Sequence, residues 1–178
     1  DEATRIELAV LKSAPPIIQA VCRSDAVEVK RLLRENPGSV HAIVEAIGRS
    51  VLGMATACGL TEIVILLLGV PDIAINHADA LGHTALRLSS VNGHVAIVKL
   101  LLGATGIDIN HVDMWGLTAL MHAAHRGDLP VVQLLLAAPG INITLCNENG
   151  DTARDFATRG AHTRIVRALV AAAVSAEQ

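Results

Sequence analysis

The sequence repeats with a period of 34 residues, and this period constrains the fold more than any single residue does. The motif Gly-x-Thr begins at Gly82, Gly116 and Gly150, and a version with Ser in place of Thr begins at Gly48. An aliphatic segment recurs in the same phase and begins at Val64, Val98, Val132 and Val166. A period of this size predicts a solenoid of stacked helical units.

One repeat, residues 79–110, shows the full pattern: Asp-x-x-Gly-x-Thr-x-Leu, then Gly-His, then Val-x-x-Leu-Leu, closing on Ile-Asn. On these residues the chain resembles the ankyrin-repeat family. Tetratricopeptide repeats have the same length, but their Trp, Tyr and Pro signature is absent here. Residues 18–33 resemble a degenerate first ankyrin helix pair. The resemblance implies an all-α solenoid of about five stacked helix–turn–helix units with extended β-turn fingers, and it covers nearly the whole chain.

We expect a single ankyrin-repeat domain over residues 1–178. Its expected parts are an N-terminal capping unit (1–44), three internal repeats (45–78, 79–112 and 113–146) and a C-terminal capping repeat (147–178). The last repeat departs from the others where its first helix should end. Ala161 stands at a position that holds glycine in the internal repeats, at Gly59, Gly93 and Gly127. We therefore expect fraying or a register adjustment in the last unit.

The composition, 52% hydrophobic with Trp115 and Phe156 as the only aromatic residues, predicts a core of Ala, Leu, Ile and Val. The longest apolar run, residues 63–71, is too short to span a bilayer, so we expect no membrane partner. Three cysteines, Cys22, Cys58 and Cys146, fall in different units and are expected to be free thiols. Free thiols favour an intracellular location, cytoplasmic or nuclear, and leave open a secreted effector that acts inside a host cell.

The charge distribution argues against nucleic acid as a partner. Acidic side chains outnumber basic ones between residues 37 and 153, whereas a nucleic-acid groove needs a basic surface. The same excess suggests a protein partner that carries basic residues.

The family resemblance implies a partner surface on the concave side, formed by the finger tips and the first helices. Carried over by position, the expected partner-binding residues are Leu81, His83, Met114, Trp115, Leu117, His125, Arg126 and Arg159. We expect an apolar centre around Trp115, flanked by the His and Arg side chains. Because Trp and Arg dominate binding hot spots, Trp115 is the favoured anchor. The alternative is that Trp115 lies over the neighbouring finger and stiffens the stack.

The expected function is a non-catalytic protein–protein interaction module, a scaffold or adaptor that acts as a monomer without a cofactor. Two alternatives stay open. The first is a small-ligand or nucleotide receptor that stacks a base on Trp115 near Arg126 and Arg159. The second is a structural spacer within a larger protein.

Neither metal binding nor catalysis is indicated. His77 and His111 lie one period apart, in successive units, too far apart to bind one zinc ion. His122 and His125 share a helix, but we expect His122 to point inward and His125 to point to the concave face. We therefore predict structural histidines and no metal site. Ser89 and Ser90 lie one unit away from His122 and His125 and could pair with them as nucleophile and base, but no catalytic motif accompanies them. We therefore expect no catalytic residues and no enzyme activity.

Two asparagines, Asn76 and Asn110, close successive fingers. Their context resembles that of ankyrin asparagines modified by an asparaginyl hydroxylase, so hydroxylation is a possible modification. The favoured alternative is that each side chain hydrogen-bonds the finger backbone.

Overall fold

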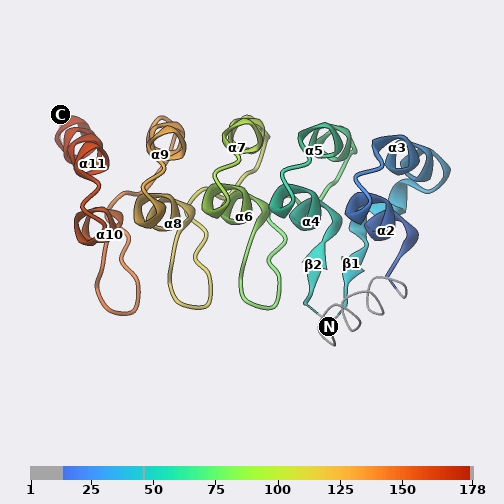
Figure 1. Ribbon diagram of the computed structural model, residues 1–178, viewed down its shortest axis with the longest axis horizontal. Helices are drawn as coiled ribbons and strands as arrows, with labels where there is room; N and C mark the ends of the chain where they lie inside the picture. Colours follow the sequence, from blue (N-terminus) through green and yellow to red (C-terminus); the bar gives the residue numbers. More distant parts are fainter. Residues whose placement is uncertain (1–13, 46, 177–178) are drawn as a thin grey trace.

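Five pairs of antiparallel helices form the body of the molecule. The structure, a computed structural model, describes residues 14–45 and 47–176. The pairs are α2 (Pro16–Cys22) with α3 (Ala26–Glu35), α4 (Val51–Ala57) with α5 (Thr61–Leu68), α6 (Ala85–Val91) with α7 (Val95–Leu102), α8 (Ala119–Arg126) with α9 (Leu129–Leu136), and α10 (Ala153–Arg159) with α11 (Thr163–Ala176). Figure 1 shows the pairs side by side in one row, with the first helices in one layer and the second helices in another.

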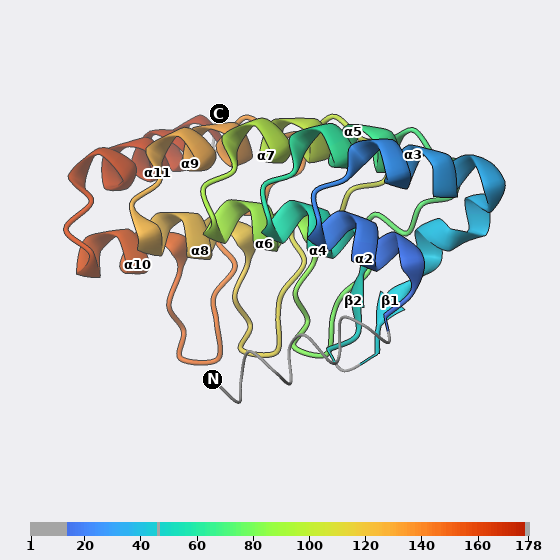
Figure 2. The same cartoon turned by 45° about the vertical axis from the view of Figure 1, so that its right-hand side comes forward.

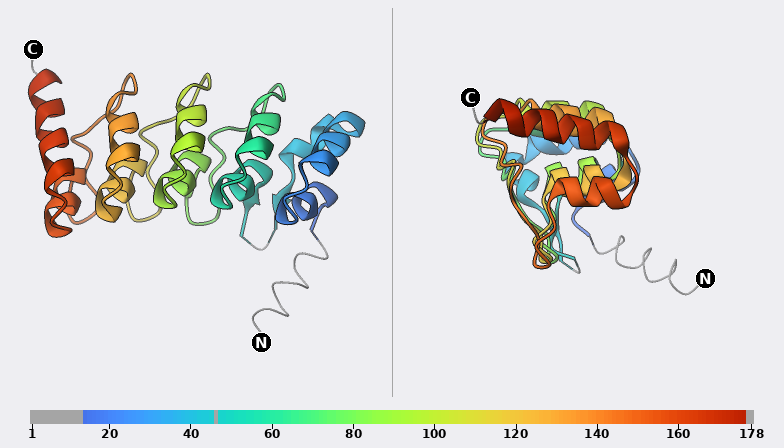
Figure 3. Two further views of the ribbon diagram at one scale, coloured as in Figure 1. Left: turned by 45° about the horizontal axis from the view of Figure 1, so that its top comes forward. Right: turned by 90° about the vertical axis from the view of Figure 1, so that its left-hand side faces the viewer.

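Extended fingers connect each pair to the next. They project from the layer of first helices at a steep angle (Figure 2), so the molecule seen end-on has an L-shaped profile (Figure 3). The first finger follows a 3₁₀ turn, η1 (Pro37–His41), and is a short hairpin in which β1 (Ile43–Val44) pairs antiparallel with β2 (Arg49–Ser50). Later fingers are closed by single bridges, Val112 with Thr118 and Cys146 with Thr152. This is the predicted helical solenoid with fingers.

The repeated hydroxyl residue starts the first helix of each internal pair. The side chains of Ser50, Thr84 and Thr118 accept hydrogen bonds from backbone N–H groups three residues later, at 3.1, 3.3 and 3.2 Å. Each such cap contributes about 1 kcal/mol. Thr152 differs, because both its hydroxyl and its backbone N–H donate to the carboxylate of Asp155, at 2.6 and 2.8 Å.

The turn after the first helix needs a left-handed residue, which explains the repeated glycine. Gly59, Gly93 and Gly127 have φ angles of 72°, 71° and 77°. In the last pair Ala161 adopts the same conformation, with φ 55°. The expected register adjustment is therefore wrong: the bond from His162 N to Ala157 O, 2.9 Å, closes this turn as the corresponding bond closes the earlier ones, and it holds Ala161 in place.

The core runs along the row between the two helix layers and consists of aliphatic side chains, as predicted. Fully buried examples from successive pairs are Ile18, Leu67, Leu101 and Leu135. Neither aromatic residue belongs to the fully buried set, and all three cysteines are exposed and free. None of the described helices is long and apolar enough to cross a membrane.

Candidate functional site

A row of exposed apolar side chains runs along the finger turns. Ile47, Leu81 and Trp115 occupy equivalent positions in three successive fingers, 34 residues apart, with exposed fractions of 39%, 42% and 46%. We call these three residues the tip row. Met114, beside Trp115, is 55% exposed. The sequence analysis missed Ile47 because it centred the surface on the third to fifth units, although its spacing from Leu81 could have revealed it.

Neighbouring tips are joined by backbone hydrogen bonds. Ala80 N donates to Ile47 O at 3.1 Å, and Met114 N donates to Leu81 O at 3.1 Å. These bonds join the tip of Ile47 to that of Leu81, and the tip of Leu81 to that of Trp115. The row is therefore a continuous surface rather than three independent loops.

A buried carboxylate shapes each of the turns that present Leu81 and Trp115. Asp79 Oδ1 accepts the N–H groups of Leu81 and His83 at 3.0 and 2.9 Å. Asp113 Oδ1 accepts those of Trp115 and Leu117, both at 3.0 Å. The two carboxylates, 2% and 0% exposed, use one oxygen to hold the turn and leave the other for a cation.

The cation beside Asp79 comes from the preceding finger. Arg49 Nη2 lies 2.7 Å from Asp79 Oδ2 and Arg49 Nε lies 3.1 Å from it. Burial alone would raise the pKa of Asp79, but the hydrogen bonds from Arg49 and from the two backbone N–H groups outweigh it and lower that pKa. Asp79 is thus ionised, paired and inaccessible to a partner.

Asp113 is held by His122 and Arg87. His122 Nε2 lies 2.9 Å from Asp113 Oδ2 and 3.1 Å from Arg87 Nε. One ring nitrogen cannot donate to the carboxylate and accept from the guanidinium at once, and the shorter contact, to an ionised acceptor, places the proton on Nε2. Burial lowers the pKa of His122 despite the hydrogen bond to Asp113, so the ring is neutral at pH 7. The expected inward direction of His122 holds, and its role is structural.

His83, an expected surface residue, lies beneath Trp115 instead. It is only 7% exposed, and its ring centroid is 5.9 Å from that of Trp115 with the planes tilted by 31°. His83 Nδ1 is 3.3 Å from Asp79 Oδ2 without hydrogen-bond alignment, and neither ring nitrogen has a partner among the described residues. Burial, followed by the charge of Arg87, lowers the pKa of His83. The neutral ring supports the indole from below and offers little surface to a partner.

The Trp115 side chain carries one polar group, the indole N–H, that has no acceptor among the described residues. The indole N–H donates to no residue in the part of the chain that the structure describes, whereas the backbone N–H of Trp115 donates to Asp113 Oδ1. Tryptophan combines a large apolar area with a donor that usually finds an acceptor when it is covered. The exposed indole is therefore suited to contact both an apolar group and a hydrogen-bond acceptor.

Three of the remaining expected residues, His125, Arg126 and Arg159, lie on the first helices α8 and α10. The His125 ring meets Phe156 edge-on at 5.8 Å, and the Arg159 guanidinium lies 4.9 Å over the Phe156 ring and pairs with Asp151. Arg126 is exposed and unpaired among the described residues. Leu117 is partly buried against the core. No hydrogen bond, ion pair or ring contact among the described residues joins His125, Phe156 or Arg159 to Trp115, and the sequence gave no signal for the position of Phe156 between His125 and Arg159.

Asn76 and Asn110 both use their side-chain amides to tie successive loops together. Asn76 Nδ2 donates to Gly106 O at 2.7 Å while Asp108 N donates to Asn76 Oδ1 at 2.8 Å. Asn110 repeats the arrangement with Gly140 O at 2.9 Å and Asn142 N at 2.8 Å. The geometry agrees with the favoured structural role. A hydroxylase would have to act on an asparagine side chain whose amide nitrogen and oxygen are both hydrogen-bonded.

The residues considered for metal binding and catalysis have structural partners. His77 and His111 bond the carbonyls of Gly48 and Gly82 at 2.7 and 3.2 Å. The hydroxyls of Ser89 and Ser90 are buried and donate to Leu86 O at 3.0 and 2.7 Å. The described residues contain no group of three or more His, Cys, Asp or Glu side chains that could hold a metal ion.

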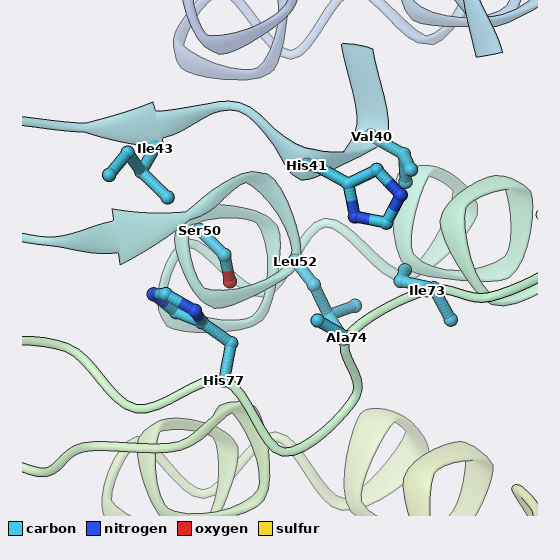
Figure 4. A pocket seen from close by; sticks show the side chains of 8 residues that line it. All are labelled: Val40, His41, Ile43, Ser50, Leu52, Ile73, Ala74 and His77. Carbon is cyan, nitrogen blue, oxygen red and sulfur yellow. The ribbon is translucent and has the colours of Figure 1, made fainter. Parts of the chain in front are cut away.

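Trp115 does not line any of four hollows that the described residues form. One of about 140 Å³ lies between the first finger, the start of α4 and the loop after α5, and it is lined by residues such as Val40, His41, Leu52 and His77 (Figure 4). This volume is below the roughly 300 Å³ at which small-molecule sites begin. Three others, of about 270, 370 and 650 Å³, lie at α11, near the α10–α11 turn and between α5 and α7. Of the two arginines expected beside Trp115, Arg159 lies over Phe156 and pairs with Asp151.

Comparison with known proteins agrees with the architecture. A family model described as "Ankyrin repeats (3 copies)" matches residues 17–113, and one described as "Ankyrin repeats (many copies)" matches residues 104–157. A comparison with curated proteins finds no match. The two matched segments together span the first four fingers and helix α10.

Proposed function

The chain belongs to the ankyrin-repeat family, whose members are generally protein–protein interaction modules, and we propose that it binds a partner protein through its finger tips and first helices as a monomer. The observation that carries this proposal is the tip row together with Met114. Four large apolar side chains, each 39–55% exposed, follow one another along three fingers, and buried ion pairs of Asp79 with Arg49 and of Asp113 with Arg87 hold the second and third of these fingers.

Rigidity matters because an interface loses less conformational entropy when its surface is ordered before binding. The tips that present Leu81 and Trp115 are each held at their base by a carboxylate that receives two backbone N–H groups. Trp115 also rests on the His83 ring. A side chain of this size on a fixed support is the kind of residue that dominates binding energy at interfaces.

The residues around Phe156 on α10 extend the proposed surface toward the C-terminal end. Arg159 is already paired with Asp151 and stacked on Phe156, whereas Arg126 has no ion-pair partner in the described part of the chain. We propose Arg126 as the charged contact of this surface, with His125 and Arg159 at its border.

The test compares two double variants that remove the same kind of side chain from opposite sides of the molecule. Leu81→Ser with Trp115→Ser alters the fingers, and Val27→Ser with Ile65→Ser alters exposed positions of the second helices. Each immobilised protein is incubated with the same cell lysate, and bound proteins are quantified by mass spectrometry. We expect at least one protein to be retained by the parent and by the second-helix variant. The amount of that protein bound to the finger variant should be at least ten-fold lower.

Equal retention by both variants would move the partner surface away from the fingers. If the second-helix variant alone lost a bound protein, the surface would lie on the second helices. Retention of nothing by the parent would favour a spacer role. Circular dichroism melts of all three proteins exclude loss of fold as the cause.

A further inference from the structure

We propose that protonation of His83 releases Trp115 from its support, so that the indole is held in a fixed position only while the His83 ring is neutral. The inference starts from a buried imidazole that has no hydrogen bond among the described residues and lies directly beneath the indole. The release is a property of the chain alone, and only its consequence for a partner rests on the proposed function.

The His83 ring is buried without satisfying its polar atoms. It is 7% exposed, and neither ring nitrogen has a hydrogen-bond partner among the described residues. Trp115 covers it, with the two ring centroids 5.9 Å apart and the planes tilted by 31°. A neutral imidazole carries one N–H, whereas an imidazolium carries two and a full charge. Protonation in this position therefore adds a second unpaired donor and a buried charge.

The charged groups around the ring are balanced before it is protonated. Those that act on it are Arg49 of β2, Asp79 and Asp113 of two successive fingers, and Arg87 of α6, and the ring in turn acts on His122 of α8. The two carboxylates offset the two guanidinium groups. A proton on His83 therefore gives this buried cluster a net positive charge.

The carboxylate nearest to the ring has no acceptor position left for it. A carboxylate offers about four such positions. Asp79 Oδ1 accepts the backbone N–H groups of Leu81 and His83, and Asp79 Oδ2 accepts Nε and Nη2 of Arg49. This arrangement accounts for the 3.3 Å separation of His83 Nδ1 from Asp79 Oδ2 without hydrogen-bond alignment. An imidazolium beside Asp79 is attracted to it but finds no free lone pair.

The balance of these effects disfavours the charged ring. Burial, followed by the charge of Arg87, lowers the pKa of His83, and the attraction of Asp79 and Asp113 does not restore it. An imidazolium under an indole gains a cation–π attraction, but this gain is smaller than the cost of burying a charge without a hydrogen bond. A proton therefore shifts the equilibrium toward an arrangement in which the ring reaches water.

Trp115 is the side chain that must yield when the ring moves. The backbone of His83 is fixed, because its N–H donates to Asp79 Oδ1 at 2.9 Å and its carbonyl accepts the Asp79 N–H at 3.1 Å. The ring therefore reaches water by rotation of the side chain. The indole above it is 46% exposed and donates no hydrogen bond to the described residues, so its displacement breaks packing contacts only.

The release is measured by acrylamide quenching of tryptophan fluorescence on the full chain between pH 8 and pH 5. Trp115 is the only tryptophan, so the signal reports on this side chain alone. We expect the quenching constant to rise about two-fold as the indole passes from about half to full exposure. The midpoint should lie below pH 6.5, the ordinary pKa of histidine, because the pKa of His83 is lowered. Far-UV circular dichroism at each pH monitors the helices.

Variants identify the group that takes up the proton. His83→Phe keeps an aromatic ring beneath Trp115 but does not titrate, so its quenching constant should be independent of pH. His83→Asn, a smaller replacement that also does not titrate, should likewise show no pH dependence and serves where the phenyl ring does not fit. The control His122→Asn removes the other buried histidine of the cluster and should keep the rise.

A quenching constant of the parent that does not change with pH would overturn the inference, as would an equal rise in both His83 variants. A rise that coincides with loss of the helical signal would also overturn it, because unfolding would then release Trp115. These outcomes leave the proposed function untouched. A captured partner should bind the parent more weakly at pH 5 than at pH 8. Affinity that is independent of pH, together with the rise in quenching, would reject the role of Trp115 in binding and not its release.

Discussion

The internal fingers and the last finger have nearly the same backbone but different chemistry. In the fingers that carry Leu81 and Trp115, a buried Asp shapes the turn and is neutralised by Arg49 or by Arg87, and in the second case the neutral His122 ring also donates to the carboxylate. In the last finger Asn147 makes the equivalent bonds, to Asn149 N at 3.0 Å and Asp151 N at 2.8 Å, and needs no cation. An amide is therefore sufficient to fold the turn.

Because an amide is sufficient to fold the turn, we infer that the buried ion pairs of the internal fingers have a role beyond shaping the turn. They connect the fingers that carry Leu81 and Trp115 to a neighbouring finger or first helix, and the tips of these two fingers are apolar. The last finger has polar tips, Glu148 and Asn149, and its single ion pair, between Asp151 and Arg159, is largely exposed. Among the described residues, the backbone bond that joins earlier tips does not recur between Trp115 and Glu148. The internal fingers are thus the rigid, apolar part of the surface.

The largest expected effect is on stability and comes from the internal carboxylate. Asp113→Ala removes two bonds to the turn and leaves Arg87 and His122 buried beside each other without an anion, so it should lower the free energy of unfolding by about 3–4 kcal/mol. Asn147→Ala, the matched change in the last finger, removes two backbone bonds only and should cost about 1–2 kcal/mol. Urea unfolding followed by circular dichroism measures both. Equal losses would mean that the ion pairs add nothing to the internal fingers.

The second prediction separates binding from stability at the tips. Trp115→Ala should lower the free energy of unfolding by only about 1 kcal/mol, because nearly half of the side chain is exposed, and should weaken a partner by about 2 kcal/mol or more. The matched change in the last finger, Asn149→Ala, should alter neither quantity by more than about 0.5 kcal/mol. Urea unfolding and titration calorimetry with the captured partner measure the two effects. A large loss of stability with unaltered affinity would instead identify Trp115 as a stiffener of the stack.

How far the sequence predicts these features depends on whether they lie within one repeat or between repeats. The caps at Thr84 and Thr118 and the left-handed glycines are local, and the 34-residue spacing reveals them. The burial of His83 is not local, because the side chain that covers it, Trp115, belongs to the next finger. The residues at the position of His83 in the neighbouring fingers are Arg49 and Leu117, whose different chemistry does not indicate whether His83 is buried. The separation of Trp115 from Phe156 likewise depends on the angle between fingers and helices, which no repeat pattern encodes.

The third prediction concerns pH and again distinguishes the internal units. The pKa values of His83 and His122 are lowered by burial, so the unfolded chain binds more protons than the folded chain as pH falls through and below 6.5. The free energy of unfolding should therefore decrease from pH 8 to pH 5. Asp79 and Asp113, whose pKa values are also lowered, add a further loss below about pH 4, when these carboxylates are protonated.

Urea unfolding at intervals between pH 8 and pH 5 measures the histidine contribution. His122→Asn keeps a donor toward Asp113 but does not titrate, so its free energy of unfolding should fall less steeply over this interval than that of the parent. A parallel decline in the two proteins would show that the buried ring of His122 contributes nothing to the pH dependence.

The smallest effect is expected at the end of α10, where the last unit departs from the glycine of the internal ones. Ala161 is held at φ 55°, a conformation that costs an L-residue about 1 kcal/mol. Glycine removes this cost but gives the unfolded chain more conformational entropy, so Ala161→Gly should raise the free energy of unfolding by about 0.5 kcal/mol. The reverse change, Gly127→Ala, adds the same backbone cost and a Cβ within 2.5 Å of the His162 ring, and should cost more than about 1 kcal/mol. Thermal melts of both variants measure the pair of effects. If Ala161→Gly were destabilising, the left-handed turn of the last unit would be free of strain, and its alanine would be an equivalent solution to the glycine of the internal units.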